Sequence, residues 1–327
     1  MTCNCDWGAN AVQRRTFLTS GLAAGVFGIP SFAQTERINV VATIGMLSDT
    51  VSVLAPSNVR VEALMGAGVD PHSFRQTRSD VVKLSKADLV VKHGLYLEAQ
   101  MVDLFERLSA RVDVFSAGEQ VPEAERLPYD EDSNQFDPHV WMDPQLWKYV
   151  ARGIANKLTV LMPGAKDEIS DRLVLFNAQL DALSNYGTQV FSTLPAKSKV
   201  LVTAHDAFQY FGRAFEFEVQ GVKGISTTSE AGLNRIERLV SFIVENDLQA
   251  IFVESSQSDR NMRALIEGAS ARGHTLSLGG TLFSDAMGTP GTYEGTYIGM
   301  MDHNITTIAR ALGADAPIRG LNGDLSI

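Results

Sequence analysis

Three of the six histidines in this sequence, His72, His139 and His205, stand where a folded chain could bring them together. Each follows a predicted strand or precedes a predicted helix, and they lie too far apart along the chain to form a local metal-binding motif. Segments that leave the carboxyl ends of parallel strands converge on one crevice, so distant residues can meet there. Neutral imidazole is a preferred ligand of zinc. The histidines therefore predict a metal site that the fold assembles.

The local sequence around these histidines favours a shared role. The tripeptide Asp-Pro-His occurs twice, at residues 70–72 and 137–139, and its proline restricts the backbone ahead of each imidazole. His205 ends the apolar run 199–204 and begins a helical segment that carries aromatic residues.

A carboxylate is the expected fourth ligand. Its oxygen would allow the site to bind harder ions such as manganese as well as zinc. Two side chains fit this role. Glu254 ends the apolar run 250–253, and Asp285 lies in the glycine-flanked loop 279–288. The residue types and their positions leave both candidates open.

The first 33 residues have the pattern of an export signal. Arg14 and Arg15 precede an apolar stretch, residues 18–32, that ends in small residues and is too short to span a membrane. The paired arginines and the glycines within the stretch favour the twin-arginine route. We therefore expect a cleaved twin-arginine-type signal peptide at residues 1–33.

The rest of the chain limits the partners and the ligand types. Both cysteines, Cys3 and Cys5, precede the expected cleavage site, so the mature chain is expected to have no disulfide, no sulfur ligand and no lipid-carrying cysteine. The net charge of −10 argues against nucleic acid and anionic lipid as partners and tolerates a cationic ligand.

The hydrophobic pattern predicts an α/β fold with two similar lobes, each with a four-stranded, mainly parallel sheet flanked by helices. Short apolar runs alternate with segments of helical spacing throughout the mature chain. The predicted strands are residues 38–44, 59–64, 88–91 and 112–115 in the first lobe, and 199–204, 219–222, 250–253 and 275–278 in the second.

One long backbone helix is predicted to join the lobes. Apolar residues recur at helical spacing over residues 164–194, and Pro163 and Pro195 bound the segment. The expected domains are an N-terminal metal-binding lobe at 34–162, the linking helix at 163–194 and a C-terminal metal-binding lobe at 195–327.

Over the whole mature chain, the sequence resembles the metal receptors of ABC importers, the solute-binding proteins for zinc, manganese and iron with a helical backbone between lobes. Seven segments in this order carry the resemblance: Gly68–Phe74, Lys92–Glu98, Asp137–Pro144, Thr203–Phe208, Gly224–Thr227, Ile251–Glu254 and Ser284–Ala286.

The resemblance implies a ligand set of His72 and His139 from the first lobe with His205 and Asp285 from the second. It places Glu254 beside the site, where it orients an imidazole. Histidine at position 205, where manganese receptors of this family have glutamate, favours zinc over manganese. The loop 122–137 is acidic and has no histidine, so it is not expected to scavenge zinc.

The resemblance also implies capture of the ion in the periplasm and delivery to an ABC permease in the inner membrane. The receptor is expected to be a soluble monomer, with a metallochaperone as a further candidate partner. Four protein ligands fill a zinc coordination sphere, so binding rather than catalysis is expected. Two alternatives stay open: a zinc-dependent hydrolase with Glu254 as general base, and a surface adhesin of the same fold.

Overall fold

The computed structural model describes residues 37–130 and 134–326, so the predicted signal peptide at 1–33 lies outside the described residues. From Glu36 onward the chain forms one compact unit. Elements before residue 163 are called the first half of this unit below, and those after residue 194 the second half. None of the helices in the described part of the chain is long and apolar enough to cross a membrane.

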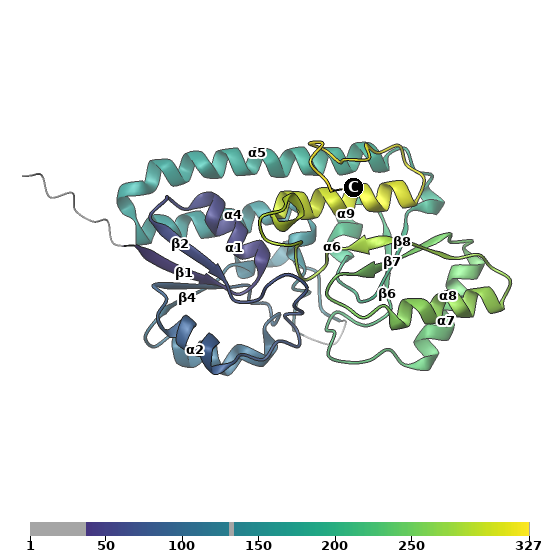
Figure 1. The fold of residues 1–327 in the computed structure, drawn as a ribbon, viewed down its shortest axis with the longest axis horizontal. Helices are drawn as coiled ribbons and strands as arrows, with labels where there is room; N and C mark the ends of the chain where they lie inside the picture. The colour runs from purple at the N-terminus through teal and green to yellow at the C-terminus, as the bar shows by residue number, and fades with distance from the viewer. Residues whose placement is uncertain (1–36, 131–133, 327) are drawn as a thin grey trace, which may run out of the picture. The chain divides into compact units, whose positions relative to one another are not determined.

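A four-stranded parallel sheet forms the first half (Figure 1). Its strands are β1 (Ile38–Ala42), β2 (Val59–Ala63), β3 (Leu89–Lys92) and β4 (Asp113–Ser116), in the spatial order β2-β1-β3-β4. The central strands β1 and β3 are largely buried apolar runs, as expected for strands that are covered on both faces. The helices of this half are α1 (Gly45–Leu54), α2 (Arg78–Ser85), α3 (Val102–Leu108) and α4 (Pro144–Leu161).

The second half also has four parallel strands, which form two hydrogen-bonded pairs. β5 (Val200–Thr203) pairs with β6 (Glu218–Gly221), and β7 (Ala250–Glu254) pairs with β8 (Ser277–Leu282). The helices of this half are α6 (Gln209–Phe215), α7 (Leu233–Glu245), α8 (Arg260–Ala271) and α9 (Tyr297–Ala311).

The strand number and direction of the second half agree with the predicted four-stranded sheet, but its ladder is not continuous. β5 and β7 are in contact, yet the hydrogen-bonded ladder stops between them. A register shift beside Ile251 and Phe252 places an extra residue, Gly279, in β8. Such bulges increase the local twist, consistent with the separation of this pair from β5 and β6.

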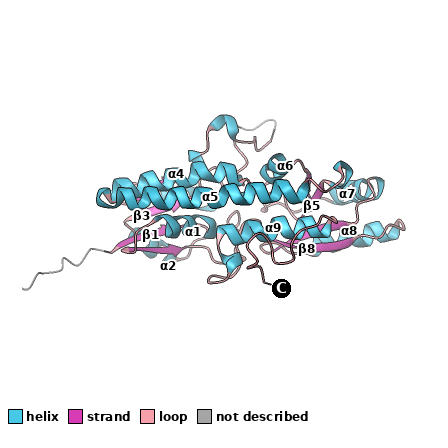
Figure 2. Ribbon diagram, turned by 90° about the horizontal axis from the view of Figure 1, so that it is seen from above, coloured by secondary structure: helices cyan, strands magenta, loops and turns pink. Residues whose placement is uncertain are grey.

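The predicted long helix is α5 (Lys166–Phe191), a little shorter at both ends than the apolar spacing indicates. Its 26 residues extend about 39 Å at 1.5 Å per residue. It packs against α1 and α4 of the first half and against α6 and α9 of the second, so it runs along both (Figures 1 and 2). The buried side chains that make these contacts include Ile169, Phe176, Leu180, Leu183, Tyr186, Val190 and Phe191.

A second helix, α9, also connects the two halves. Its first residue, Tyr297, donates its main-chain N–H to Asp49 of α1 at 2.9 Å and its hydroxyl to the Trp141 carbonyl at 2.8 Å. The Tyr297 ring stacks on Trp147 of α4 with centroids 5.2 Å apart. The start of α9 therefore packs in the first half, although α9 belongs to the second half by sequence.

Candidate metal centre

Four buried side chains converge between the two halves: His72, His139, His205 and Asp285. One donor atom from each lies within 4.8 Å of all the others. The two Nε2 atoms of His72 and His139 are 3.3 Å apart, and the Asp285 carboxylate lies 3.3 Å from His139 Nε2 and 3.2 Å from His205 Nε2. Four donors in a tetrahedron about 2.0 Å from a central ion are about 3.3 Å apart. These three separations are close to that value, and all four donors lie within 4.8 Å of one another, so the cluster is compact enough to surround a zinc ion.

The topology of the fold explains the convergence. His72 lies in the connection after β2, while His205 and Asp285 follow the carboxyl ends of β5 and β8. His139 ends the long connection after β4, directly before the 3-10 turn Val140–Met142. Two donors come from each half, so the site exists only where both halves meet.

Several atoms of this cluster lack a hydrogen-bond partner. His205 Nε2 and both carboxylate oxygens of Asp285 are buried and form no hydrogen bond within the described residues. Buried polar atoms normally have a partner, because their desolvation is otherwise uncompensated. A bound cation would satisfy all three once the proton on His205 has left, since these atoms lie together in the cluster of four residues.

Two of the imidazoles are oriented by carboxylates. His139 Nδ1 lies 2.6 Å from Asp137 Oδ1, and His205 Nδ1 lies 2.5 Å from Glu254 Oε2. The main-chain N–H of each histidine donates to the same carboxyl group. With Nδ1–H donated in this way, each Nε2 is left free to face the site. The structure thus places Glu254 behind His205, outside the group of four.

Asp137 is a contact that the sequence reasoning missed. Its position two residues before His139, in the Asp-Pro-His tripeptide, was the available signal. The other copy behaves differently: Asp70 Oδ1 accepts the main-chain N–H of His72, and Asp70 Oδ2 accepts the hydroxyls of Ser73 and Thr227. The same tripeptide therefore orients an imidazole ring in one copy and connects the two halves in the other.

The contact between Thr227 and Asp70 predicts a kinetic effect. Thr227 lies in the loop after β6, and its hydroxyl donates to Asp70 Oδ2 at 2.6 Å, across the boundary between the halves. A hydrogen bond to a charged group contributes about 1.5–3 kcal/mol, so we expect Thr227→Val to release bound metal about tenfold faster. Stopped-flow transfer of the metal to a chelator measures this rate.

Two matched variants control for other effects of the substitution. Thr227→Ser keeps the hydroxyl and should release metal at the wild-type rate. Thr228→Val removes the neighbouring hydroxyl, which lies 2.9 Å from the Ser226 hydroxyl in the same loop, and should also leave the rate unchanged. Equal release rates in Thr227→Val and the wild type would show that the contact does not hold the His72 loop.

The electrostatics of the cluster favour a cation. Burial lowers the pKa of His139, but the neighbouring carboxylates outweigh it and raise the pKa to about 9. At His205 burial also lowers the pKa, but the charges of Asp285 and Glu254 outweigh it and hold the pKa well above its usual range. Burial raises the pKa of Asp285, yet the adjacent imidazoles hold it well below the ordinary value. Burial lowers the pKa of His72 to about 4, so this ring is neutral. A divalent ion would replace the protons on His139 and His205.

The other three described histidines bond to main-chain carbonyls outside the cluster. His93 Nε2 lies 2.7 Å from the Pro138 carbonyl, His274 Nε2 lies 2.6 Å from that of Leu248, and His303 Nε2 lies 2.9 Å from that of Thr281.

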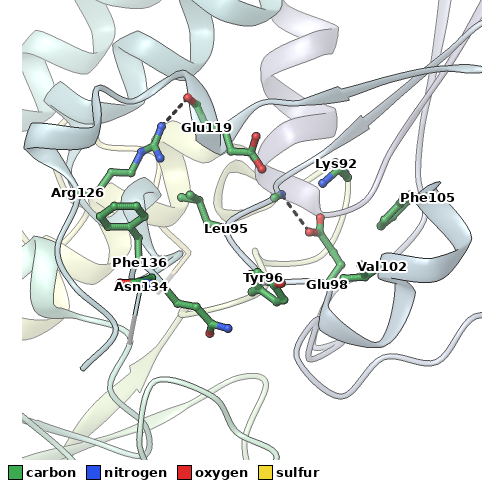
Figure 3. Close-up of a pocket in the computed structure, with 12 residues that line it drawn as sticks. Lys92, Leu95, Tyr96, Glu98, Val102, Phe105, Glu119, Arg126, Asn134 and Phe136 are labelled. Atoms are coloured by element: carbon green, nitrogen blue, oxygen red, sulfur yellow. Dashed lines mark hydrogen bonds between the residues drawn. The ribbon is translucent and has the colours of Figure 1, made fainter. Parts of the chain in front are cut away.

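A cavity of about 420 Å³ lies apart from the four residues, beside the segment that follows β3 (Figure 3). Its walls include Tyr96 and Glu98 from that segment. Two cations lie over aromatic rings here: Arg126 is 5.2 Å from the centroid of Phe136, and Lys92 is 5.6 Å from that of Phe105.

Comparison with known proteins assigns the chain to a family. The family model described as "Zinc-uptake complex component A periplasmic" matches residues 40–311. The chain is 44% identical to the zinc-binding protein TroA of Treponema pallidum over 90% of this chain and 96% of the relative. It is 39% identical to the manganese-binding lipoprotein MntA of Bacillus subtilis over 92% and 97% of the two chains.

A solved structure agrees with the sequence comparisons. The periplasmic zinc-binding protein TroA from Treponema pallidum superimposes with a TM-score of 0.82 at 45% identity, over 84% of this chain and 99% of that chain. This likeness confirms the predicted α/β fold with parallel sheets flanked by helices. The family predicted from the seven sequence segments is confirmed as well: the chain belongs to the ZnuA family of periplasmic metal-binding proteins of ABC importers.

Proposed function

We propose that this chain captures one divalent transition-metal ion through His72, His139, His205 and Asp285 and delivers it to an ABC importer. The observation that carries the proposal is the set of four buried donors, one from each residue, that lie within 4.8 Å of one another. The similarity to a zinc-binding and a manganese-binding relative supports the same conclusion.

Zinc is the favoured ion and manganese the next candidate. Three imidazole nitrogens and one carboxylate are a donor set typical of zinc, whereas manganese favours sites richer in oxygen. Asp285 turns both of its oxygens toward the histidines, one toward His139 and one toward His205. A carboxylate in this orientation supports a fifth bond to a larger ion, which keeps manganese within reach of the site.

Capture rather than hydrolysis fits the coordination sphere. Four protein donors leave no position for the activated water that a zinc hydrolase requires. The four side chains are also between 0 and 4% exposed, so a substrate would have to displace protein to reach the ion.

The remaining assignments follow from this role. We propose export by a twin-arginine-type signal at residues 1–33 and work in the periplasm as a monomer, with an inner-membrane permease as partner and a metallochaperone as a candidate source of the ion. The proposed domains are a first lobe at 34–162, the linking helix at 163–194 and a second lobe at 195–327. Donors from both lobes would close around the ion.

Metal analysis of protein purified from its native compartment tests the function. We expect about one zinc ion per chain, and X-ray absorption should report three nitrogen donors and a carboxylate. Competition between zinc and manganese must accompany the analysis, because affinity in vitro follows the Irving–Williams order whatever ion the cell supplies. Metal-free protein, or an ion with a bound water in an open position, would contradict the proposal.

A further inference from the structure

The segment that follows β3 has an unusual backbone. Gly94, Leu95 and Tyr96 have φ angles of 82°, 53° and 62°, so three consecutive residues are left-handed and two of them carry side chains. Such conformations are unfavourable for residues other than glycine and persist only where the surroundings enforce them. The contacts around this segment should therefore show what it is built to hold.

A buried carboxylate holds the start of this segment. Glu98, which is 3% exposed, accepts the main-chain N–H of His93 at 2.7 Å and that of Gly94 at 3.1 Å. It also accepts the hydroxyl of Thr43, at the end of β1, at 2.6 Å. Successive N–H groups that converge in this way form an anion-binding concavity, and here a side chain of the same segment fills it (Figure 3). The main chain of His93 is thereby fixed at the end of β3.

The ring of His93 is fixed as well. It is fully buried, stacks parallel to Trp147 with centroids 6.5 Å apart, and meets Trp141 edge-on at 5.0 Å. Gly118 makes room for it, because a Cβ at that position would lie 2.6 Å from His93 Nε2. This nitrogen lies 2.7 Å from the Pro138 carbonyl, which accepts a hydrogen bond from the Nε2–H group.

The accepting carbonyl belongs to the peptide that joins Pro138 to His139. The preceding carbonyl, that of Asp137, accepts the Tyr210 hydroxyl at 2.9 Å, and the Asp137 side chain holds the His139 ring. Two successive carbonyls ahead of His139 are thus each held by a buried side chain.

We propose that His93 is a positioning residue for the metal centre: its Nε2–H holds the Pro138–His139 peptide, and Glu98 holds His93 in turn. This inference rests on the proposed function, since it assigns a task to a residue that does not itself reach the ion. Burial lowers the pKa of His93 to about 3, so the ring is neutral and donates from Nε2 throughout the pH range in which histidine binds metal.

A pair of substitutions at His93 tests the inference. His93→Leu removes the donor, and we expect it to weaken zinc binding about 10–100-fold, as loss of an outer contact to a metal ligand typically does. His93→Gln restores an N–H donor and should recover most of that affinity. The absorption spectrum of the Co²⁺-loaded protein should change in His93→Leu and return toward wild type in His93→Gln, because it reports the donor geometry directly.

A control separates positioning from general stability. Tyr186→Phe removes the buried hydroxyl that contacts Thr306 between α5 and α9. It should lower the melting temperature of the metal-free protein and leave both the zinc affinity and the Co²⁺ spectrum unchanged. Wild-type zinc affinity together with a wild-type Co²⁺ spectrum in His93→Leu would overturn the inference. Failure of the wild-type chain to bind zinc at all would instead overturn the proposed function.

A second variant decides the matter if His93→Leu does not fold. Glu98→Gln is nearly isosteric, but its amide nitrogen cannot accept the N–H of Gly94, so the support behind His93 loosens while every metal-site residue stays in place. We expect at least about threefold weaker zinc binding and a shifted Co²⁺ spectrum. Unchanged values for both in a folded Glu98→Gln protein would overturn the inference.

Discussion

Replacing His139 by alanine should weaken zinc binding at least about tenfold and reduce the rise in melting temperature that zinc causes. The His139 ring is fully buried, and its Nε2 lies 3.3 Å from donor atoms of both His72 and Asp285. Packing cannot replace a lost nitrogen donor at the centre of such a cluster. His205→Ala should behave in the same way, because His205 Nε2 is also fully buried and lies 3.2 Å from Asp285.

Competition with a chromophoric chelator measures the affinity, and thermal unfolding with and without zinc measures the stabilisation. His274→Ala is the matched control, since the His274 ring bonds to the Leu248 carbonyl and lies outside the cluster. Its zinc affinity should equal that of the wild type. Unchanged zinc affinity in both His139→Ala and His205→Ala would contradict the assignment of the site.

Zinc affinity should also fall steeply as the pH is lowered. In the metal-free protein His139, with a pKa of about 9, and His205, with a pKa well above the usual value, both hold protons at neutral pH. Zinc binds only neutral imidazole, so binding below about pH 9 should release about two protons and weaken about 100-fold per pH unit of acidification. Histidines with the ordinary pKa of about 6.5 would compete with zinc only below that pH.

Affinity measured from about pH 6 to about pH 10 distinguishes the two cases, and calorimetry in buffers of different protonation enthalpy counts the protons. Asp137→Asn removes the charge that stabilises protonated His139, so this variant should release about one proton at neutral pH. An affinity that is already constant between about pH 7 and pH 8 would contradict the predicted proton competition.

The convergence of the four candidate ligands could be predicted from the sequence, whereas some of the contacts around them could not. The sequence places His205 directly after a predicted strand and Asp285 in the loop that follows another, and the carboxyl ends of parallel strands converge in folds of this class. The convergence of the four residues therefore follows from the pattern of elements together with the family segments. The difference between the two Asp-Pro-His copies does not, because the role of Asp70 depends on Thr227, a residue far along the chain.

Some features of the backbone and of the strand pairing could not be predicted from the sequence either. Leu95 and Tyr96 favour right-handed or extended backbone, so their residue types do not predict the positive φ angles that both adopt. The predicted helix 164–194 exceeds α5 at both ends because its bounds were set by Pro163 and Pro195, whereas the chain forms a 3-10 turn at Pro163–Ala165 and the α-helix ends at Phe191. The strand runs of the second half were predicted, whereas the break in their ladder depends on strand twist, which the residue pattern does not encode.

The position of α9 limits how the chain can be divided. The main-chain N–H of Tyr297 donates to the Asp49 carboxylate, and the Tyr297 ring stacks on Trp147 and lies edge-on to Phe176 of α5. Residues near the C-terminus therefore complete the packing of the N-terminal half. A fragment that ended after the linking helix would leave one face of Trp147 open to water and the half-buried carboxyl group of Asp49 without its N–H donor. Each half would therefore be a poor candidate for separate expression. During synthesis, the N-terminal half cannot complete its core until the last helix has left the ribosome.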